Sequence, residues 1–259
     1  MTALPFIRRP RQLPVGLILP AALLIIWEVT ARAGLLNPIL SPAPSLVFTR
    51  LFTMLAAGEL RVDIGASLAR LAIGALAGSL IAIPLGLLIG SSRLARHLLG
   101  PSFNVLKQIA LFAWIPLISV WFGTGEVAKV VFVSMAVFTP VVINTWEGTA
   151  EVPEHLREVA RIYALGPAAR LRRLILPAAL PQIFTGLRLG LIYGWLATVG
   201  AEYFMTVAPG IGSQMTAGRE LLEMDLVMVG VLLLGGIGFA INSIAEASER
   251  RLVSWKNHH

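Results

Sequence analysis

The sequence predicts an all-α, polytopic membrane protein, and three observations support this prediction. Apolar residues make up 56% of the 259 residues and charged residues only 14%, below the roughly 25% of an average soluble domain. Six stretches approach the ~20 apolar residues that a spanning helix needs. The net charge of +7 comes from short arginine and lysine clusters beside these stretches, which is typical of membrane proteins rather than of nucleic-acid-binding proteins.

The six predicted transmembrane helices cover most of the chain. Their approximate bounds are Leu13 to Ala33, Ala66 to Gly90, Phe103 to Phe122, Ala128 to Trp146, Ala178 to Met205, and Leu226 to Ala245. Between the first two, prolines interrupt the chain and apolar residues then recur at helical spacing. We expect Ser45 to Ala57 to form a short amphipathic helix on the membrane surface.

Glycines and prolines inside the spans predict close packing and bends. The pairs Gly74 with Gly78 and Gly86 with Gly90 form small-x-x-x-small patterns, which permit close approach of another helix. Prolines are expected to bend the second, third and fourth spans; they are Pro84, Pro116 and Pro140.

Basic residues predict the orientation. With a cytoplasmic N-terminus, arginine and lysine gather in the tails at 1–12 and 249–259, after the second span (Arg93, Arg96, Lys107), and in a loop at 148–177. The tails and this loop are therefore predicted to be cytoplasmic, around one transmembrane domain at 13–248. A cleaved signal peptide is the alternative for the N-terminus, but its apolar region would be long, would contain Glu28, and its removal would leave an odd number of spans.

The sequence lacks the residues that several kinds of functional site require. There is no cysteine, which excludes disulfides and thiolate metal sites, and the four histidines are too scattered for a metal site. A phosphate-binding Gly-x-x-x-x-Gly-Lys-Ser/Thr motif is missing, so no ATP site is expected in this chain. The Gly-x-Ser-Gly motif and membrane histidine of a rhomboid-like protease are missing too. No catalytic residue, cofactor or metal is predicted.

Polar residues within the spans are candidates for function. Arg188 and Glu202 are fourteen residues apart in the fifth span, about 21 Å along a helix, too far to pair. Arg188 is expected to snorkel or serve structure, with attraction of an anionic substrate as the alternative; Glu202 is expected to act as a gate or to hydrogen-bond between helices. Asn144 is expected to bond across helices. Glu126 and Lys129 are expected to be solvated at a helix end.

The loop at 148–177 carries helix signals of its own. Pro153 suits the first turn of a helix, and an apolar face follows at i, i+3, i+4 and i+7, made of Leu156, Val159, Ala160 and Tyr163. Glu154 and Glu158 precede Arg157 and Arg161 by three residues, which predicts two surface pairs. Gly166-Pro167 is expected to end this helix, and 168–175 to form a second basic helix. From the residues alone, the loop could either dock a partner protein or bind anionic lipid head groups through its arginines.

The order of residues in this loop resembles the EAA loop of bacterial binding-protein-dependent ABC importer permeases. Glu158-Val159-Ala160, then Ala164, and finally Leu176-Pro177 match its spacing without a gap. Val159 replaces the usual middle alanine, and Ala164 stands where glycine is usual, with Gly166 two residues later.

The resemblance extends over nearly the whole chain, to the permease branch that serves sulfonates, taurine and nitrate. It rests on the order of short motifs, among them Ser67-Leu-Ala-Arg70, Ile83-Pro-Leu-Gly86, Trp121-Phe-Gly123 and Gly186-Leu-Arg188. Ala110 departs from the branch, which usually has proline there, so a changed helix break is expected.

The resemblance implies a type I ABC importer permease in the bacterial inner membrane. Its expected partners are a second copy of the chain, two cytoplasmic ATPase subunits that bind ATP and Mg, and a periplasmic or lipid-anchored solute-binding protein. It assigns ATPase coupling to the loop, at Glu158, Val159, Ala160, Ala164, Gly166, Leu176 and Pro177. Arg188, Glu202 and Asn144 are the candidates for the pathway or gate.

The expected cargo is a small organic anion. An alkanesulfonate or taurine is favoured, with nitrate, bicarbonate or another small solute as alternatives. The alternative from a different class is a channel or membrane scaffold that needs no ATPase, in which case the loop would only anchor to lipid.

Overall fold

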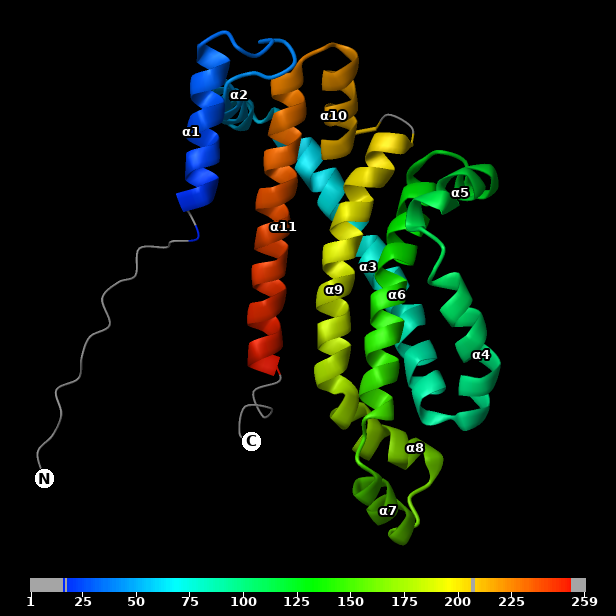
Figure 1. Cartoon of the computed structure of the whole chain (residues 1–259). Helices are drawn as coiled ribbons and strands as arrows, with labels where there is room; N and C mark the ends of the chain where they lie inside the picture. Colours follow the sequence, from blue (N-terminus) through cyan, green and yellow to red (C-terminus); the bar gives the residue numbers. More distant parts are fainter. Residues whose placement is uncertain (1–15, 17, 206–207, 253–259) are drawn as a thin grey trace, which may run out of the picture.

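The computed structural model describes residue 16 and residues 18–205 and 208–252, and every regular element in that part of the chain is helical. Four long helices run between its two ends (Figure 1): α3 (Glu59–Ser91), α6 (Glu126–Ala150), α9 (Leu176–Phe204) and α11 (Met224–Leu252). We call the end with α7 (Glu154–Ile162) and α8 (Pro167–Arg170) the loop end, and the end with α5 (Ile115–Phe122) and α10 (Ile211–Glu220) the far end.

The predicted second, fourth, fifth and sixth spans are confirmed as long apolar helices. Four helices in the described residues are long and apolar enough to cross a membrane, with bounds Glu59–Ser91, Glu126–Ala150, Pro167–Phe204 and Met224–Arg251. The fifth predicted span is lengthened most, because α8 continues into α9 to make a helix of 38 residues. Pro84 and Pro140 lie inside continuous helices.

The predicted third span is not one helix bent at Pro116 but two helices with a break between them. Its place is taken by α4 (Arg93–Leu106), a 3-10 turn at Leu111–Trp114, and α5, with a bend of 91° between the two halves. Ala110 has an extended backbone, with ψ 131°, so the break forms without the usual proline. Pro116 lies in the first turn of α5, where its missing N–H costs no hydrogen bond and its ring favours helix initiation.

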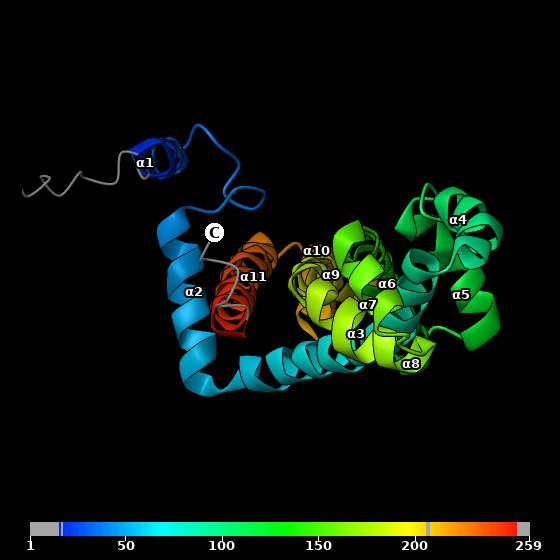
Figure 2. The ribbon, with the colours of Figure 1, turned by 90° about the horizontal axis from the view of Figure 1, so that it is seen from below.

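The first predicted span lies partly outside the described residues. Its described part, α1 (Ile18–Arg32), has 15 residues, none of them buried. Figure 2 shows α1 apart from the other long helices, and it is joined to α2 (Pro44–Ala57) by Glu28, which accepts hydrogen bonds from the Ser45 backbone N–H at 3.0 Å and hydroxyl at 2.8 Å. The 14 residues of α2 are too few to cross a membrane, as expected for 45–57.

The core forms where α6 packs between α3 and α9. One face of α3 has glycines at four positions, and a Cβ atom there would lie 2.5–2.6 Å from atoms of α6: Gly74, Gly78, Gly86 and Gly90. On the other side, a Cβ at Gly186 of α9 would lie 2.9 Å from that of Asn144. The packing predicted from the glycine pairs is confirmed, and the backbones approach more closely than larger residues would allow.

Alanine at Gly78 is expected to destabilise the bundle. Its Cβ would lie 2.5 Å from the Ser134 carbonyl oxygen, and such overpacking costs about 1–3 kcal/mol. Gly65 lies in the same helix with nothing within 4 Å of a Cβ, so Gly65→Ala should instead raise stability by up to ~1 kcal/mol through helix propensity. Thermal unfolding of both variants in detergent measures the difference, and equal stabilities would contradict this packing.

Candidate functional site

The basic loop, residues 148–177, begins with α7, which ends in a Schellman motif. The Leu165 N–H donates to the Ala160 carbonyl at 3.0 Å and the Ala164 N–H to the Arg161 carbonyl at 2.9 Å. This motif places its second-last residue in the left-handed region, and Ala164 has φ 47°. Ala164 thus occupies a position that favours glycine. The prediction that Gly166-Pro167 ends α7 was wrong, because Gly166 is the N-cap of α8.

Glycine at position 164 is expected to stabilise the end of α7. The left-handed conformation costs an alanine roughly 1–2 kcal/mol, and glycine adopts it freely. Amide hydrogen exchange in 154–165 should therefore slow by about fivefold or more in Ala164→Gly, since ~1 kcal/mol is a factor of about five. Gly166→Ala is the control because Gly166 has φ −61°; slower exchange in that variant alone would refute the assignment.

The second basic segment is continuous with α9 rather than a separate helix. Residues Leu171–Ile175 form a π-helical turn, in which the Leu176 N–H donates to the Leu171 carbonyl. Pro177 explains the turn, because proline has no N–H and its ring clashes with the carbonyl four residues earlier. Leu176 is half-buried and Pro177 is exposed.

Arg157 ties α7 to the end of α6. Its guanidinium donates to the carbonyls of Thr149 at 3.0 Å and Ala150 at 3.2 Å, where a cation also meets the negative end of the helix dipole. Arg161 pairs with Glu154 at 2.9 Å. The two surface pairs predicted three residues apart were therefore wrong. Arg157 donates to carbonyls at the end of α6, and exposed Glu158 makes no ion pair with any described residue.

The side of α7 that faces away from the bundle is apolar. Ile162 is 81% exposed and Tyr163 75% exposed, with Val159 and Leu156 beside them. We call these four residues the apolar patch. Ala160 is buried, so one member of the predicted apolar face points inward. Ile162 was missed because it falls outside the i, i+3, i+4, i+7 pattern. Exposed apolar patches among charges are typical of protein contact surfaces.

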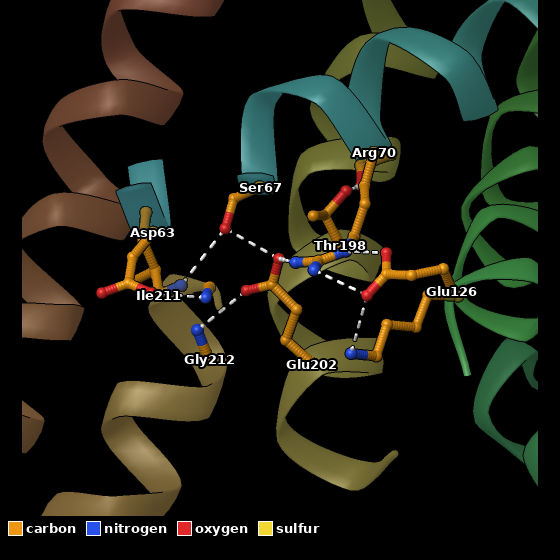
Figure 3. A network of polar contacts seen from close by, with 11 residues as sticks. Asp63, Ser67, Arg70, Glu126, Thr198, Glu202, Ile211 and Gly212 are labelled. Atoms are coloured by element: carbon orange, nitrogen blue, oxygen red, sulfur yellow. Dashed lines mark hydrogen bonds and ion pairs between the residues drawn. The ribbon is translucent and has the colours of Figure 1, made fainter. Parts of the chain in front are cut away.

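A second polar site, the charge network, lies buried near the far end (Figure 3). Glu202, 1% exposed, accepts hydrogen bonds from the Ser67 hydroxyl at 2.7 Å, Arg70 Nη1 at 2.6 Å and the Gly212 N–H at 2.9 Å. Arg70 also binds both carboxylate oxygens of Glu126, at 2.6 and 2.8 Å. Glu202 thus bonds between helices, and its expected role as a gate stays a prediction.

The network continues into the start of α10. Asp63 accepts hydrogen bonds from the Gly210 N–H at 2.7 Å and from Gln214 Nε2 at 2.6 Å, while the Ser67 hydroxyl accepts one from the Ile211 N–H at 3.2 Å. Carboxylates are favourable at a helix N-terminus. Sequence reasoning missed these residues of α3, although three polar residues spaced by three or four in an apolar helix are a usable signal: Asp63, Ser67 and Arg70.

The expectation that Glu126 and Lys129 are solvated was wrong for Lys129. Its side chain is 0% exposed, with Nζ 3.5 Å from a Glu126 oxygen. Helical spacing explains this, because Lys129 shares a face of α6 with buried Phe132 and Val133. Removing one partner from a buried charge pair typically costs about 3–5 kcal/mol, so these contacts hold α3, α6, α9 and α10 together.

Arg188 and Asn144 lie apart from this network. Arg188 donates to Asn242 at 3.0 Å and pairs with Glu246 and Glu249 at 3.5 and 3.6 Å, which joins α9 to α11 and favours the structural role. Asn144 Nδ2 donates to the Pro140 carbonyl in its own helix, at 2.8 Å, so the expected bond across helices was wrong. The structure does not bring the three candidate pathway residues together.

A cavity beside the break between α4 and α5 was also missed. It has a volume of about 580 Å³ and is lined by 106–111 together with residues of α6 and α9, among them Thr139 and Tyr193. Lys107, the C-cap of α4, is its only charged lining residue. The helix α4 ends near mid-height of the bundle (Figure 1), so its C-cap follows a helix end that lies between the loop end and the far end.

Comparison with known proteins places these features in a family. Residues 82–254 match the family described as binding-protein-dependent transport system inner membrane component. The chain is 33% identical to SsuC of Bacillus subtilis, named as an aliphatic sulfonates transport permease, over 94% of this chain and 88% of that protein. It is 32% identical to the taurine transport system permease TauC of Escherichia coli, over 95% and 90%.

The chain is also similar to a bicarbonate permease and to a solved methionine transporter. The bicarbonate transport system permease CmpB of Synechococcus elongatus is 31% identical, over 96% of this chain and 91% of that protein. A chain of the MetNI methionine ABC transporter, in inward-facing conformations, matches with a TM-score of 0.58 at 21% identity, over 71% of this chain and 94% of that chain. The predicted permease fold is confirmed.

Proposed function

The chain belongs to the family of binding-protein-dependent transport inner membrane components, and we propose that it is driven by a separate ATPase that docks on α7 and imports a small organic anion. As a permease of an ABC importer it is a multi-pass membrane protein. The observation that carries the proposal is the apolar patch at the exposed tip of the basic loop, on a helix fixed to the bundle by Arg157.

Two connections would transmit movement of α7 into the bundle. Arg157 joins α7 to the end of α6, and the unbroken helix from Pro167 to Phe204 joins the loop to α9. An ATPase pair that closes on ATP and Mg would pull the coupling helices of two permease copies together. In this proposal Glu158, Val159 and the turn at Ala164 form the docking surface, while Ala160, Gly166, Leu176 and Pro177 shape it from behind.

Serine at Ile162 or Tyr163 is expected to weaken ATPase binding. Loss of a large apolar anchor at an interface typically costs 1–2 kcal/mol or more, so co-purification of the cognate ATPase should fall by about tenfold. Both side chains are exposed, so the membrane fold should survive. Leu221→Ser, at a far-end residue that is 68% exposed, is the matched control.

The same measurement decides between function classes. If the ATPase stays bound to Ile162→Ser and Tyr163→Ser, α7 is not the docking helix, and an ATPase-independent channel or scaffold becomes the better interpretation. Because an ABC ATPase is cytoplasmic, binding at α7 would also place the loop end, the start of α1 and the end of α11 on the cytoplasmic side of the bacterial inner membrane.

We also propose that two copies of the chain assemble with two ATPase subunits and a solute-binding protein. The exposed apolar side chains of α1, among them Leu23 and Ile25, are a suitable surface for the second copy, since none of the described residues of α1 is buried within its own chain. The far end, with α5 and α10, would receive the solute-binding protein.

The cargo we propose is an alkanesulfonate or taurine, and the relatives SsuC and TauC support this. Lys107 supports an anion, because a charged residue at membrane depth usually faces an aqueous cavity or substrate path. CmpB makes bicarbonate the leading alternative. Nitrate was expected from the resemblance and stays a prediction.

Neutralising Lys107 is expected to reduce anion uptake. In proteoliposomes with the full complex and its cognate binding protein, Lys107→Gln should lower taurine or alkanesulfonate uptake by about tenfold, the loss of one charge-assisted hydrogen bond. Lys107→Arg should retain most activity, and ATPase binding should stay unchanged in both. Unaltered uptake by Lys107→Gln, or transport of neutral or cationic solutes only, would refute the proposed pathway.

A further inference from the structure

A separate cavity at the loop end has arginine at five of its nine lining residues. It has a volume of about 460 Å³ and lies between the turn from α3 to α4 and the basic loop. Its lining includes five arginines and one carboxylate: Arg93, Arg96, Arg157, Arg161, Arg170 and Glu154. We call it the arginine cavity. It is distinct from the cavity at Lys107 and from the apolar patch.

Three of these arginines already have partners in the protein. Arg96 Nη2 donates to the Gly90 carbonyl near the end of α3, at 2.8 Å. Arg157 binds carbonyls at the end of α6, and Arg161 pairs with Glu154 at 2.9 Å. Arg93 and Arg170 have no acidic partner among the described residues, and Arg170 Nε is buried without any hydrogen bond to them.

The cavity therefore holds more positive charge than its surroundings balance. Five guanidiniums face one carboxylate and two helix C-termini, and each C-terminus counts as roughly half a negative charge. About three positive charges are left over. Arginine stays protonated under all ordinary conditions, so the cavity cannot relieve this excess by losing protons, and the excess favours binding of an anion.

From this excess and the buried free donor on Arg170, we propose that the arginine cavity binds a phosphate group. Guanidinium presents a planar fork of N–H donors that matches two oxygens of phosphate, and the cavity has room for such a group. The phosphate belongs either to an anionic lipid head group or to a free phosphate ion. This site is independent of the proposed transport function.

The geometry of α7 separates this site from ATPase docking. Glu154, Arg157 and Arg161 recur at i, i+3 and i+7, on one side of the helix. Val159, Ile162 and Tyr163, at i, i+3 and i+4, lie on the opposite side, and they are exposed. One helix would thus contact a protein with one face and hold the phosphate with the other.

The test uses the full chain in nanodiscs with two probes. Inorganic phosphate is titrated into phosphatidylcholine nanodiscs by calorimetry, and retention of phosphatidylglycerol from mixed nanodiscs is measured by native mass spectrometry. Arg170→Gln and Arg93→Gln should each weaken binding by about tenfold or more, because each removes a charge-assisted hydrogen bond. Arg172→Gln is the matched control, since Arg172 is exposed next to the cavity and outside its lining.

The outcomes separate the sources and decide the proposal. Phosphate binding that Arg170→Gln weakens and Arg172→Gln does not supports a free ion, and the same pattern for phosphatidylglycerol alone supports a lipid head group. Exposed Arg93 keeps the test valid if Arg170→Gln does not fold. The proposal is overturned if neither probe binds, if all three variants lose binding equally, or if Arg170→Gln and Arg93→Gln bind both probes as well as the unmodified chain does.

Discussion

The structure depends on the close approach of α6 to α3 and α9. Within a bilayer the hydrophobic effect does not drive helices together, because lipid tails are as apolar as leucine, so packing must supply the association. Here the packing is set by Gly74, Gly78, Gly86 and Gly90 of α3, which approach α6 so closely that a Cβ would lie 2.5–2.6 Å from its atoms. A side chain at any of these four glycines would push the two backbones apart.

The position of the basic loop depends on the same packing of α3, α6 and α9. Arg157 fastens α7 to the last carbonyls of α6, and a π-helical turn before Pro177 carries α8 into α9 without a break. Force on α7 therefore reaches two of the three core helices directly. Of the peripheral helices, α2 packs on the bundle through buried Val47 and Met54, whereas α1 has no buried residue and is left to make contacts outside the chain.

The sequence predicted the long helices and their glycine contacts. It did not predict features that depend on other parts of the fold, such as the partners of charged side chains. Four spans and the glycine contacts followed from apolar length and small-residue spacing. A bend in the third span was expected from Pro116 and a changed break from Ala110, but the size of the bend, 91°, was not, because a sequence pattern can mark a break without giving its angle. The partners predicted for charged side chains were also wrong. Arg157 donates to carbonyls at a helix end and Lys129 is buried in the core, and both positions are determined by tertiary structure.

The two ends of the bundle differ in charge balance, and this difference affects which ligands each end can bind. At the far end, Asp63, Glu126 and Glu202 face Arg70 and Lys129, and the N-terminus of α10 adds a partial positive charge. The charges of this network nearly cancel within one chain, although Lys129 Nζ is buried without a hydrogen bond to any described residue. At the loop end the five arginines of the arginine cavity face one carboxylate among its lining residues. A bound anion would balance charge at the loop end, whereas the far end has little net charge for a ligand to balance.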